Sequence, residues 1–282
     1  MKKFLAILSS VILILSIFTA CSENSQEVDA VTQTTKATTT ETTTVRTTED
    51  LSTTFKEVET AKIYPALKKD TSDKYSYKLS TYKTAYQSSN KTRTVNIQNA
   101  VKRLNNLVIP DGETFSFNQV VGKRTVLAGY EEAKVVQGDE FVDGLGGGIC
   151  QVSSTIFQAA LRANLDITVR ACHSLEISYV PLGSDATVQW NSQDFQFKNN
   201  SGSDIKLKVT AENGTLVCSI YAVKDVTVGI VKVKIEKNSD DSYTLIRTVN
   251  GKENYSTYSK YKKAKVTTTK KDKDKSTTKK KS

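Results

Sequence analysis

The apolar residues of this 282-residue chain are gathered in its middle, and this distribution determines where a folded domain can lie. Residues 60–260 contain enough Val, Ile, Leu, Phe and Tyr to bury a hydrophobic core, whereas such residues are sparse in most of both flanks. Because of those flanks, the overall hydrophobic content is only 38%, which is low for a compact protein. The length permits one medium-sized domain or two small ones, which we expect in the middle segment.

Two helical patterns and a series of short strand-like runs predict the fold class of the middle segment. Residues 94–106 carry apolar side chains at helical spacing, with Thr94 as a candidate N-cap. The glycine-rich run at residues 144–148 opens a second helix at residues 150–164. Strand-like runs lie at residues 114–118, 134–136, 167–172, 177–180, 187–190, 195–198, 205–210 and 216–223. We predict an α+β fold, in which helices pack on a mostly antiparallel sheet.

Two segments border the predicted core. Residues 61–223 are expected to form the main domain, although residues 61–92 are rich in Tyr and Lys and have no clear assignment. Residues 226–237 and 243–249 indicate a further hairpin. We therefore expect residues 224–261 to be a β-rich extension, which either enlarges the main sheet or forms a small appendage.

Residues 1–21 resemble the leader peptide of an exported bacterial lipoprotein. Lys2 and Lys3 precede the apolar stretch Phe4–Phe18, which is too short for a stable membrane span. Small residues directly before Cys21 resemble a lipobox, in which the cysteine is acylated. An ordinary secretory signal with an incidental cysteine is the alternative. A lipid on Cys21 predicts a protein anchored at the extracytoplasmic face of the cell membrane.

A Thr-rich segment separates the leader from the predicted domain. Between Thr32 and Thr54, more than half of the positions are Thr, and no apolar periodicity is present. We expect residues 22–60 to be a disordered linker that lifts the domain away from the membrane.

The net charge of +10 comes from the two ends of the chain. Residues 262–282 contain ten Lys and two Asp, and Lys2 and Lys3 account for the remaining excess. The central part is therefore close to neutral, and a nucleic-acid-binding face is not expected. We expect a disordered Lys-rich tail at residues 262–282. Its predicted partners are anionic wall polymers or lipid headgroups, unless the tail only increases solubility.

Cys150 has the sequence environment of a reactive thiol. It follows three glycines and begins a helix, whose first-turn N–H groups and dipole favour a thiolate. The backbone N–H groups of Cys150 and Gln151 are candidates for an oxyanion hole. Besides Cys21, the chain has Cys150, Cys172 and Cys218, an odd number for an exported domain.

His173 is the only histidine and follows Cys150 across one predicted helix and one predicted strand. A helix and an adjacent strand can bring the two side chains together. Such a pair supplies the nucleophile and the proton carrier that cysteine acyl transfer requires. Asp185 is a candidate to orient the imidazole.

Other interpretations of these residues are open. A single cysteine and a single histidine are core or surface residues more often than catalytic ones. A zinc site formed by Cys150, Cys172, His173 and Cys218 lacks the usual C-x-x-C spacing. Neighbouring residues on a strand face opposite sides, which argues against joint ligation by Cys172 and His173. A disulfide between Cys172 and Cys218 is a further alternative. We expect no metal and no cofactor.

A set of motifs between residues 90 and 210 resembles the VanW family. The most specific motif is Gly146–Thr155, which has the sequence GGGICQVSST. The other motifs lie at residues 112–118, 121–125, 129–130, 173–174, 179–183 and 185–188. The chain departs from the family pattern at Glu176, where family members often have Pro, and at Ser184, where they often have Arg.

The family is named from a glycopeptide-resistance gene cluster, in which its role is accessory. Some VanW domains have been proposed as cysteine L,D-transpeptidases, and the resemblance implies this activity here. Cys150 would attack the carbonyl of the third residue of a peptidoglycan stem peptide and expel D-Ala. The acyl group would then pass to an amine of a neighbouring stem, forming a 3–3 cross-link, with His173 as base and acid. Candidate oxyanion or substrate-binding residues are Gly148, Gln151 and Arg124. Arg162 is a further candidate substrate residue. A packing or surface role is the expected default for Gln151, Arg124 and Arg162.

A second function class is compatible with the same residues. A non-catalytic module that binds peptidoglycan or a glycopeptide would need the domain and its anchor, but not the thiol of Cys150. Thiol reactivity separates the two classes, because a catalytic cysteine reacts with alkylating reagents much faster than a buried structural one.

Overall fold

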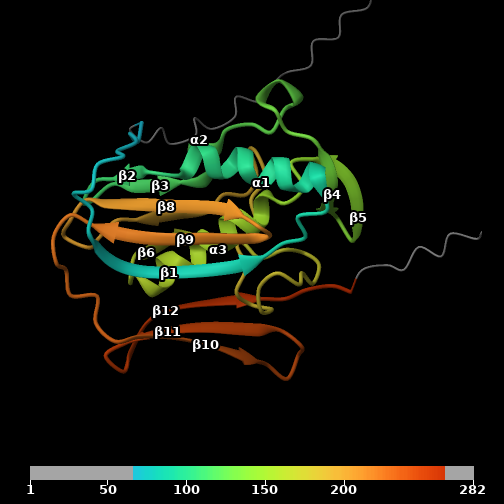
Figure 1. Cartoon of the computed structure of the whole chain (residues 1–282). Helices are drawn as coiled ribbons and strands as arrows, with labels where there is room; N and C mark the ends of the chain where they lie inside the picture. The colour runs from blue at the N-terminus through green and yellow to red at the C-terminus, as the bar shows by residue number, and fades with distance from the viewer. Residues whose placement is uncertain (1–65, 264–282) are drawn as a thin grey trace, which may run out of the picture. The chain divides into compact units, whose positions relative to one another are not determined.

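The computed structural model describes residues 66–263, all of which belong to one structural unit, Glu59–Ser282 (Figure 1). The predicted leader with Cys21 and the predicted linker at residues 22–60 lie outside the described residues, as does most of the predicted tail at residues 262–282. Within the described part, no helix has both the length and the apolar character needed to cross a membrane.

The main sheet has four antiparallel strands in the order β1-β9-β8-β2. These strands are β1 (Tyr77–Ala85), β2 (Leu107–Ile109), β8 (Ile205–Glu212) and β9 (Thr215–Ala222), and Figure 1 shows β1, β9 and β8 side by side. A tight turn at Asn213-Gly214 joins β8 to β9, and both turn residues have positive φ. Alternating apolar side chains of β8 and β9 are buried, as expected for strands with one core-facing side.

Two helices pack against this sheet. Helix α1 (Lys91–Leu104) contacts β8, and helix α3 (Ile149–Arg162) contacts β1 and β9. Of the 14 residues of α3, 12 are buried, so this helix forms the centre of the core. The predicted helix at residues 150–164 is confirmed.

The start of α1 differs from the prediction. Asn90, and not Thr94, caps the helix, because the side chain of Asn90 accepts a hydrogen bond from the N–H of Arg93 at 3.1 Å. Thr94 lies inside the helix, where its hydroxyl donates to the carbonyl of Asn90 at 2.8 Å. The prediction missed the cap because the first turn contains polar residues, and the apolar periodicity begins only after it.

Two smaller sheets are formed by strands between residues 114 and 198. One has the order β3-β7-β6, with β3 (Thr114–Ser116), β6 (Asp166–Val169) and β7 (Gln196–Lys198), and the other is the hairpin of β4 (Glu132–Gln137) and β5 (Glu140–Leu145). Ser116 ends β3 by capping the short helix α2 (Phe117–Val121), so the predicted strand at 114–118 is shorter than expected. A 3-10 turn, η1 (Val126–Ala128), leads into β4.

The β-rich extension forms a sheet of its own, in the order β10-β11-β12. Its strands are β10 (Val231–Lys237), β11 (Tyr243–Val249) and β12 (Lys252–Ser259), of which the last was not predicted. Arg247 of β11 is buried, and its guanidinium donates to the carbonyl of Leu165 at 2.7 Å and to that of Leu161 at 3.4 Å. This contact satisfies carbonyl groups at the end of α3 and fixes the third sheet to the core.

Two predicted strands are irregular segments. Residues 177–180 and 187–190 form no sheet, although Val180 and Val188 are buried. Their apolar side chains produced the strand-like pattern, but their backbone groups bind other loops; for example, the N–H of Thr187 donates to the carbonyl of Ala171 at 2.9 Å. The α+β class with mostly antiparallel sheets is confirmed.

Candidate active site

The glycine run ahead of α3 places Cys150 in the first turn of a buried helix. Gly148 precedes the helix with a φ of +110°, a conformation that favours glycine. At Gly147, a Cβ atom would lie 2.7 Å from the backbone carbon of Ala133 and 2.7 Å from the carbonyl oxygen of Lys134, both in β4. The run therefore allows the β4–β5 hairpin to lie directly against the start of the helix.

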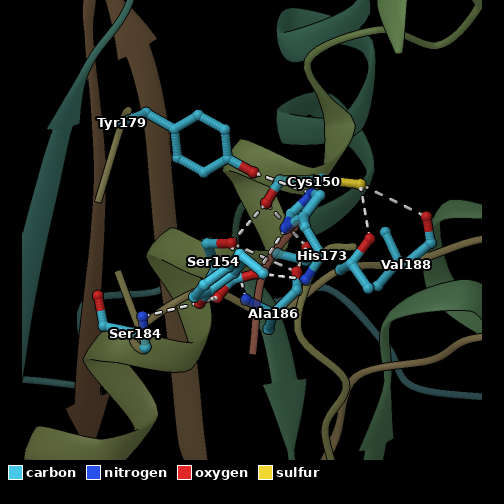
Figure 2. Close-up of polar contacts among 12 residues, drawn as sticks. Cys150, Ser154, His173, Tyr179, Ser184, Ala186 and Val188 are labelled. Carbon is cyan, nitrogen blue, oxygen red and sulfur yellow. Dashed lines mark hydrogen bonds and ion pairs between the residues drawn. The ribbon is translucent and has the colours of Figure 1, made fainter. Parts of the chain in front are cut away.

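Buried hydroxyl groups of α3 hold a second loop beside Cys150. Ser154 donates to the carbonyl of Cys150 at 2.7 Å and accepts from the N–H of Ala186 at 2.9 Å (Figure 2). Ser153 donates to the carbonyl of Ala186 at 2.5 Å. These bonds satisfy the buried polar groups and fix the loop that carries Asp185 and Thr187.

The Cys150 thiol is half-buried and faces this loop. Its sulfur lies 3.6 Å from Oγ1 of Thr187 and 3.5 Å from the carbonyl oxygen of Val188 (Figure 2). Burial raises the pKa of the thiol, but a hydrogen bond with His173 and the positive charge of that ring together outweigh burial and lower the pKa from 9.0 to about 7. A substantial thiolate fraction is therefore present at neutral pH.

His173 lies between Cys150 and Asp185. Its Nδ1 is 2.5 Å from Oδ2 of Asp185, and its backbone N–H donates to the same oxygen at 2.7 Å. Burial lowers the pKa of His173, but the bonds with Asp185 and Cys150 raise it overall from 6.5 to about 10. Cys150 and His173 therefore form a thiolate–imidazolium pair.

Asp185 is fully buried and remains ionised. Burial raises the pKa of its carboxyl group, but His173 and Arg170 favour the charged form and lower the pKa below its usual value. The Oδ1 atom lies 3.1 Å from Nη2 of Arg170 and accepts from the hydroxyl of Tyr261 at 2.5 Å. Tyr261 follows the third sheet, so the β-rich extension takes part in holding the carboxylate.

Tyr179 completes the surroundings of the imidazole. Figure 2 shows its hydroxyl directed toward His173, and the oxygen lies 3.3 Å from Nε2. Burial and the nearby negative charges of Cys150 and Asp185 raise the pKa of the phenol well above 10.0, so it remains protonated. The hydroxyl is thus available as a hydrogen-bond partner beside the thiol.

The thiol opens into a cleft of about 820 Å³. Its walls include the β4–β5 hairpin, the glycine run and the loop that follows Asp185. Apolar side chains at its margin include Phe141, Leu145 and Trp190, each of which is more than a third exposed. A cleft of this size accommodates a short peptide or another ligand of comparable size.

Gln151 is fully engaged by protein groups. Its Oε1 accepts from Nη2 of Arg93 at 2.8 Å, and its Nε2 donates to the hydroxyl of Thr84 at 3.0 Å and to the carbonyl of Ala85 at 2.8 Å. Its backbone N–H donates to the carbonyl of Gly148 at 3.0 Å. Of the two N–H groups predicted to form an oxyanion hole, that of Gln151 is therefore already occupied. Among the described residues, the N–H of Cys150 has no partner and remains the backbone donor beside the thiol.

The two arginines predicted as candidate substrate residues, Arg124 and Arg162, differ in their surroundings. Arg124 lines the cleft, and one of its nitrogens donates to Oδ1 of Asn118 at 2.7 Å. Arg162 binds Gln158 within α3 and lies over the ring of Tyr82, 4.6 Å from its centroid. A packing role therefore describes Arg162, whereas Arg124 lies at the site.

The remaining thiols do not form the predicted alternatives. Cys172 and Cys218 are both free, so the alternative of a disulfide between them is wrong. Cys218 is buried in β9 within the main sheet, and burial raises the pKa of its thiol. Within residues 66–263, no cluster of three or more potential metal-binding side chains occurs, which excludes the zinc arrangement of Cys150, Cys172, His173 and Cys218.

The arrangement joins a thiolate, a proton carrier and a buried carboxylate beside an open cleft. It contains what nucleophilic acyl transfer requires, and the predicted proximity of Cys150, His173 and Asp185 is present. Their catalytic role stays a prediction. Tyr179 was not predicted as a site residue, although it lies in the family motif at residues 179–183. Arg93, Arg170 and Tyr261 were also missed, because no sequence pattern surrounds them.

Comparisons with known proteins agree with the motifs. Residues 92–221 match the family model described as VanW like protein. The chain is 42% identical to the uncharacterized protein YoaR of Bacillus subtilis over 167 residues. This alignment covers 59% of this chain and 55% of YoaR. Over 134 residues it is 29% identical to the vancomycin B-type resistance protein VanW of Enterococcus faecalis, which covers 46% of this chain and 49% of that protein.

The chain spans about half the length of these two curated relatives. No solved structure matches it significantly. The region shared with the family includes α1, α3 and the loop that carries Asp185, but neither β1 nor the third sheet.

Proposed function

This chain belongs to the VanW family through residues 92–221, and from that premise we propose that it is a cysteine acyltransferase that acts on peptidoglycan stem peptides. The observation that carries the proposal is the pairing of Cys150 with His173, which lowers the pKa of the thiol to about 7 in the lining of an open cleft. A structural thiol has no need of such a partner; Cys218, for example, is buried without one.

The proposed reaction has two steps. The thiolate of Cys150 adds to the carbonyl carbon of the third stem residue, and the imidazolium of His173 gives its proton to the departing amine of D-Ala. The resulting thioester is attacked by an amine of a second stem, whose proton passes to the neutral imidazole. The thiolate leaves, and the new amide is a 3–3 cross-link.

Asp185 and Tyr179 act on the imidazole in this scheme. The carboxylate of Asp185 binds Nδ1 and leaves Nε2 directed at the reacting groups. Tyr179 lies 3.3 Å from Nε2 and limits the rotation of the ring. The N–H of Cys150 is the proposed donor to the oxygen of the tetrahedral intermediate.

We also propose where the reaction takes place. The leader-like residues 1–21 and the lipobox-like Cys21 support an exported, lipid-anchored protein at the extracytoplasmic face of the membrane. The Lys-rich residues 262–282 would there face anionic wall polymers or lipid headgroups.

The test is an incubation of the purified full-length protein with peptidoglycan that carries tetrapeptide stems, followed by mass spectrometry of the muropeptides. The Cys150→Ala variant is the inactive form, and Cys172→Ala is the matched thiol control. We expect 3–3 dimers and released D-Ala with the wild type and with Cys172→Ala, and neither product with Cys150→Ala. A folded wild-type protein that yields no product would rule out the enzyme.

The second candidate function is non-catalytic binding of peptidoglycan or a glycopeptide. Similarity to a relative named for vancomycin B-type resistance favours it. Retention on purified peptidoglycan that is unchanged by Cys150→Ala, without any product in the incubation above, would support this function instead.

A further inference from the structure

The cleft beside Cys150 is positively charged. Besides His173, four basic side chains line it, and no Asp or Glu is found among its described lining residues; the four are Arg93, Lys123, Arg124 and Lys134. Lys134 has its own partner, because its Nζ lies 3.0 Å from Oδ2 of Asp143. Lys123 and Lys134 are exposed, whereas the two arginines are half-buried. The arginines are therefore the more buried cations of the cleft lining.

Arg93 reaches the cleft from the first turn of α1. Its Nη2 donates to the side chain of Gln151, the residue after the thiol, at 2.8 Å. Within the described residues it forms no ion pair, and its Nε and Nη1 atoms have no protein partner. Burial lowers the pKa of Arg93, while its electrostatic interactions with Tyr179 and Cys150 act in the opposite sense. The guanidinium thus lies within electrostatic reach of the reacting sulfur.

Arg124 reaches the same cleft from the loop after α2. Its Nη1 binds Asn118 at 2.7 Å and the carbonyl of Gly122 at 3.1 Å, but its Nη2 is buried without any hydrogen-bond partner. A buried charged donor without a partner is costly, so an acceptor is expected in the bound state. Burial lowers the pKa of Arg124, and Cys150 again acts in the opposite sense.

A carboxylate of the protein does not neutralise Arg124. Asp194 raises its pKa electrostatically, but no ion pair joins the two among the described residues. Asp194 already accepts from the hydroxyl of Ser116 at 2.6 Å and from the N–H groups of Asn118 and Phe195 at 2.9 and 2.8 Å. The side chain of Gln196 donates to it at 2.8 Å as well.

The glycine run brings both arginines to the thiol. A Cβ at Gly148 would lie 3.0 Å from Cγ of Arg93, and a Cβ at Gly146 would lie 3.0 Å from Cγ of Arg124. The aliphatic parts of the two side chains therefore pack on either end of the three glycines, immediately before Cys150. Their guanidinium groups are held at the cleft by this packing.

We propose that Arg93 and Arg124 together bind a carboxylate of the substrate beside Cys150, so that the acyl donor is a peptide whose departing residue carries a free α-carboxylate. The proposal rests on the proposed function, because it assigns this carboxylate to the leaving D-Ala. In a tetrapeptide stem, the carboxylate lies one residue beyond the scissile bond. In a longer stem or an internal peptide bond, an amide occupies that position and cannot pair with two guanidinium groups.

A binding experiment tests the proposal without turnover. Trp190 is the only tryptophan of the chain and lines the cleft, so its fluorescence reports binding to the full-length Cys150→Ala protein. The probes are a synthetic stem tetrapeptide and the same peptide with a C-terminal carboxamide. We expect the free acid to bind about tenfold to a hundredfold more tightly, since hydrogen bonds to charged groups are the stronger ones.

Variants assign the preference to the arginines. Arg93→Gln and Arg124→Gln, each in the Cys150→Ala protein, are expected to weaken binding of the free acid and to bring the ratio of the two affinities close to one. Lys134→Gln removes a cleft cation that already has a partner and is expected to keep the ratio. Arg124→Lys keeps the charge without the two parallel donors and is expected to restore the ratio only in part.

The outcomes distinguish this proposal from the proposed function. In the Cys150→Ala protein with both arginines intact, equal binding of the free acid and the carboxamide overturns the carboxylate site, as does the absence of binding by either peptide. This result does not depend on the folding of the arginine variants. A preference for the acid that survives both Arg→Gln changes also overturns the carboxylate site. If the wild-type protein shows equal kcat/KM for the free acid and the carboxamide, the enzyme is supported and the carboxylate site is contradicted. If the free acid binds selectively but no acyl transfer occurs, the carboxylate site is supported and the enzyme is contradicted.

Discussion

At the scale of single residues, Cys150 and His173 titrate as a pair. The pKa of the thiol is lowered to about 7 and that of the imidazole is raised to about 10, so thiolate and imidazolium coexist between these values. We expect the rate of iodoacetamide alkylation at Cys150 to increase as the pH rises through about 7. Acyl transfer should show the same increase and then decrease above about 10, where the imidazolium that protonates the leaving amine is lost.

The readout for this pH dependence is the rate of alkylation at each thiol, measured from pH 5 to 11 by mass spectrometry of the labelled peptides. Cys218 provides the internal control, because burial raises the pKa of its thiol and removes it from solvent. Slow alkylation of Cys150 and Cys218 at equal rates throughout this range would contradict the thiolate assignment.

Asp185 favours the protonated form of the imidazole, so its replacement should change the pKa of the Cys150 thiol indirectly, through His173. In Asp185→Asn, the pKa of His173 is expected to fall toward its ordinary value, and the pKa of Cys150 to rise. Alkylation of Cys150 at pH 7 should then be slower by at least about tenfold. Asp143→Asn is a matched surface control, because within residues 66–263 Asp143 pairs with the exposed Lys134 alone. An unchanged rate in Asp185→Asn would exclude the coupling.

Local sequence signals identified the centre of this site but not its periphery. The glycine run marks Cys150, and His173 is the only histidine of the chain, so both could be predicted from a single sequence. Arg93 and Tyr261 lie far from Cys150 along the chain, and each acts through a contact that only the folded chain creates. Neither has a surrounding pattern that separates it from an ordinary surface residue.

At the scale of elements, Gly147 is the point where the β4–β5 hairpin meets α3. In Gly147→Ala, the new methyl group would lie 2.7 Å from backbone atoms of β4, which cannot move like a flexible side chain. We expect a loss of about 1–3 kcal/mol in the free energy of unfolding, together with slower alkylation of Cys150 as the hairpin is displaced. Chemical denaturation and the alkylation assay measure the two effects.

The control for Gly147 is Gly202→Ala. Gly202 has a φ of +78° and open space around its Cβ position, so its replacement costs only backbone strain, about 1–2 kcal/mol. It lies outside the residues that line the cleft and should leave the reactivity of Cys150 unchanged. If Gly147→Ala also left that reactivity unchanged, the hairpin would not position the thiol.

The third sheet supports the site through Tyr261. Its hydroxyl accepts from the N–H of Gly183 at 2.7 Å and donates to Asp185 at 2.5 Å. In Tyr261→Phe, we expect kcat to fall several-fold with little change in KM, because Asp185 loses one of the donors that hold it beside His173. Tyr258→Phe is the matched control: it removes an exposed hydroxyl that binds Asp240 at 3.1 Å. Equal effects of the two changes would point to a general loss of stability.

Elements whose apolar residues repeat at a regular spacing could be predicted from the sequence. Elements whose conformation depends on pairing with a distant segment could not. Helix α3 shows a long apolar pattern, and the sequence placed both of its ends closely. Strand β1 combines Tyr, Lys, Ser and Thr, and its strand conformation follows from pairing with β9 along the edge of the main sheet. The runs at 177–180 and 187–190 have strand-like composition, but the polar side chains of α3 bind the loop beside them instead.

At the scale of the whole molecule, the fold extends beyond the region shared with the family. Strand β1 pairs with β9 and carries Thr84, which is bound to Gln151. After the shared region, Lys262 pairs with the loop of His173, because its N–H donates to the carbonyl of Ser174 at 2.7 Å. The predicted tail therefore starts at the site itself. The contacts that hold Gln151, Asp185 and the loop of His173 thus depend in part on segments that lie outside the shared region.

The proposed anchor links this domain to its substrate, and Cys21 is the residue that tests it. If Cys21 is acylated, the protein expressed in a bacterial host should enter the detergent phase on Triton X-114 partitioning, since the acyl chains bury many methylene groups in the membrane. Cys21→Ala should move the protein to the aqueous phase or the medium, whereas Ser22→Ala should leave it with the detergent. If the anchor serves only to localise the protein, Cys150 of the Cys21→Ala protein should alkylate at the wild-type rate. An aqueous wild-type protein would favour the ordinary secretory signal, and the domain would then have to reach the wall by binding it directly.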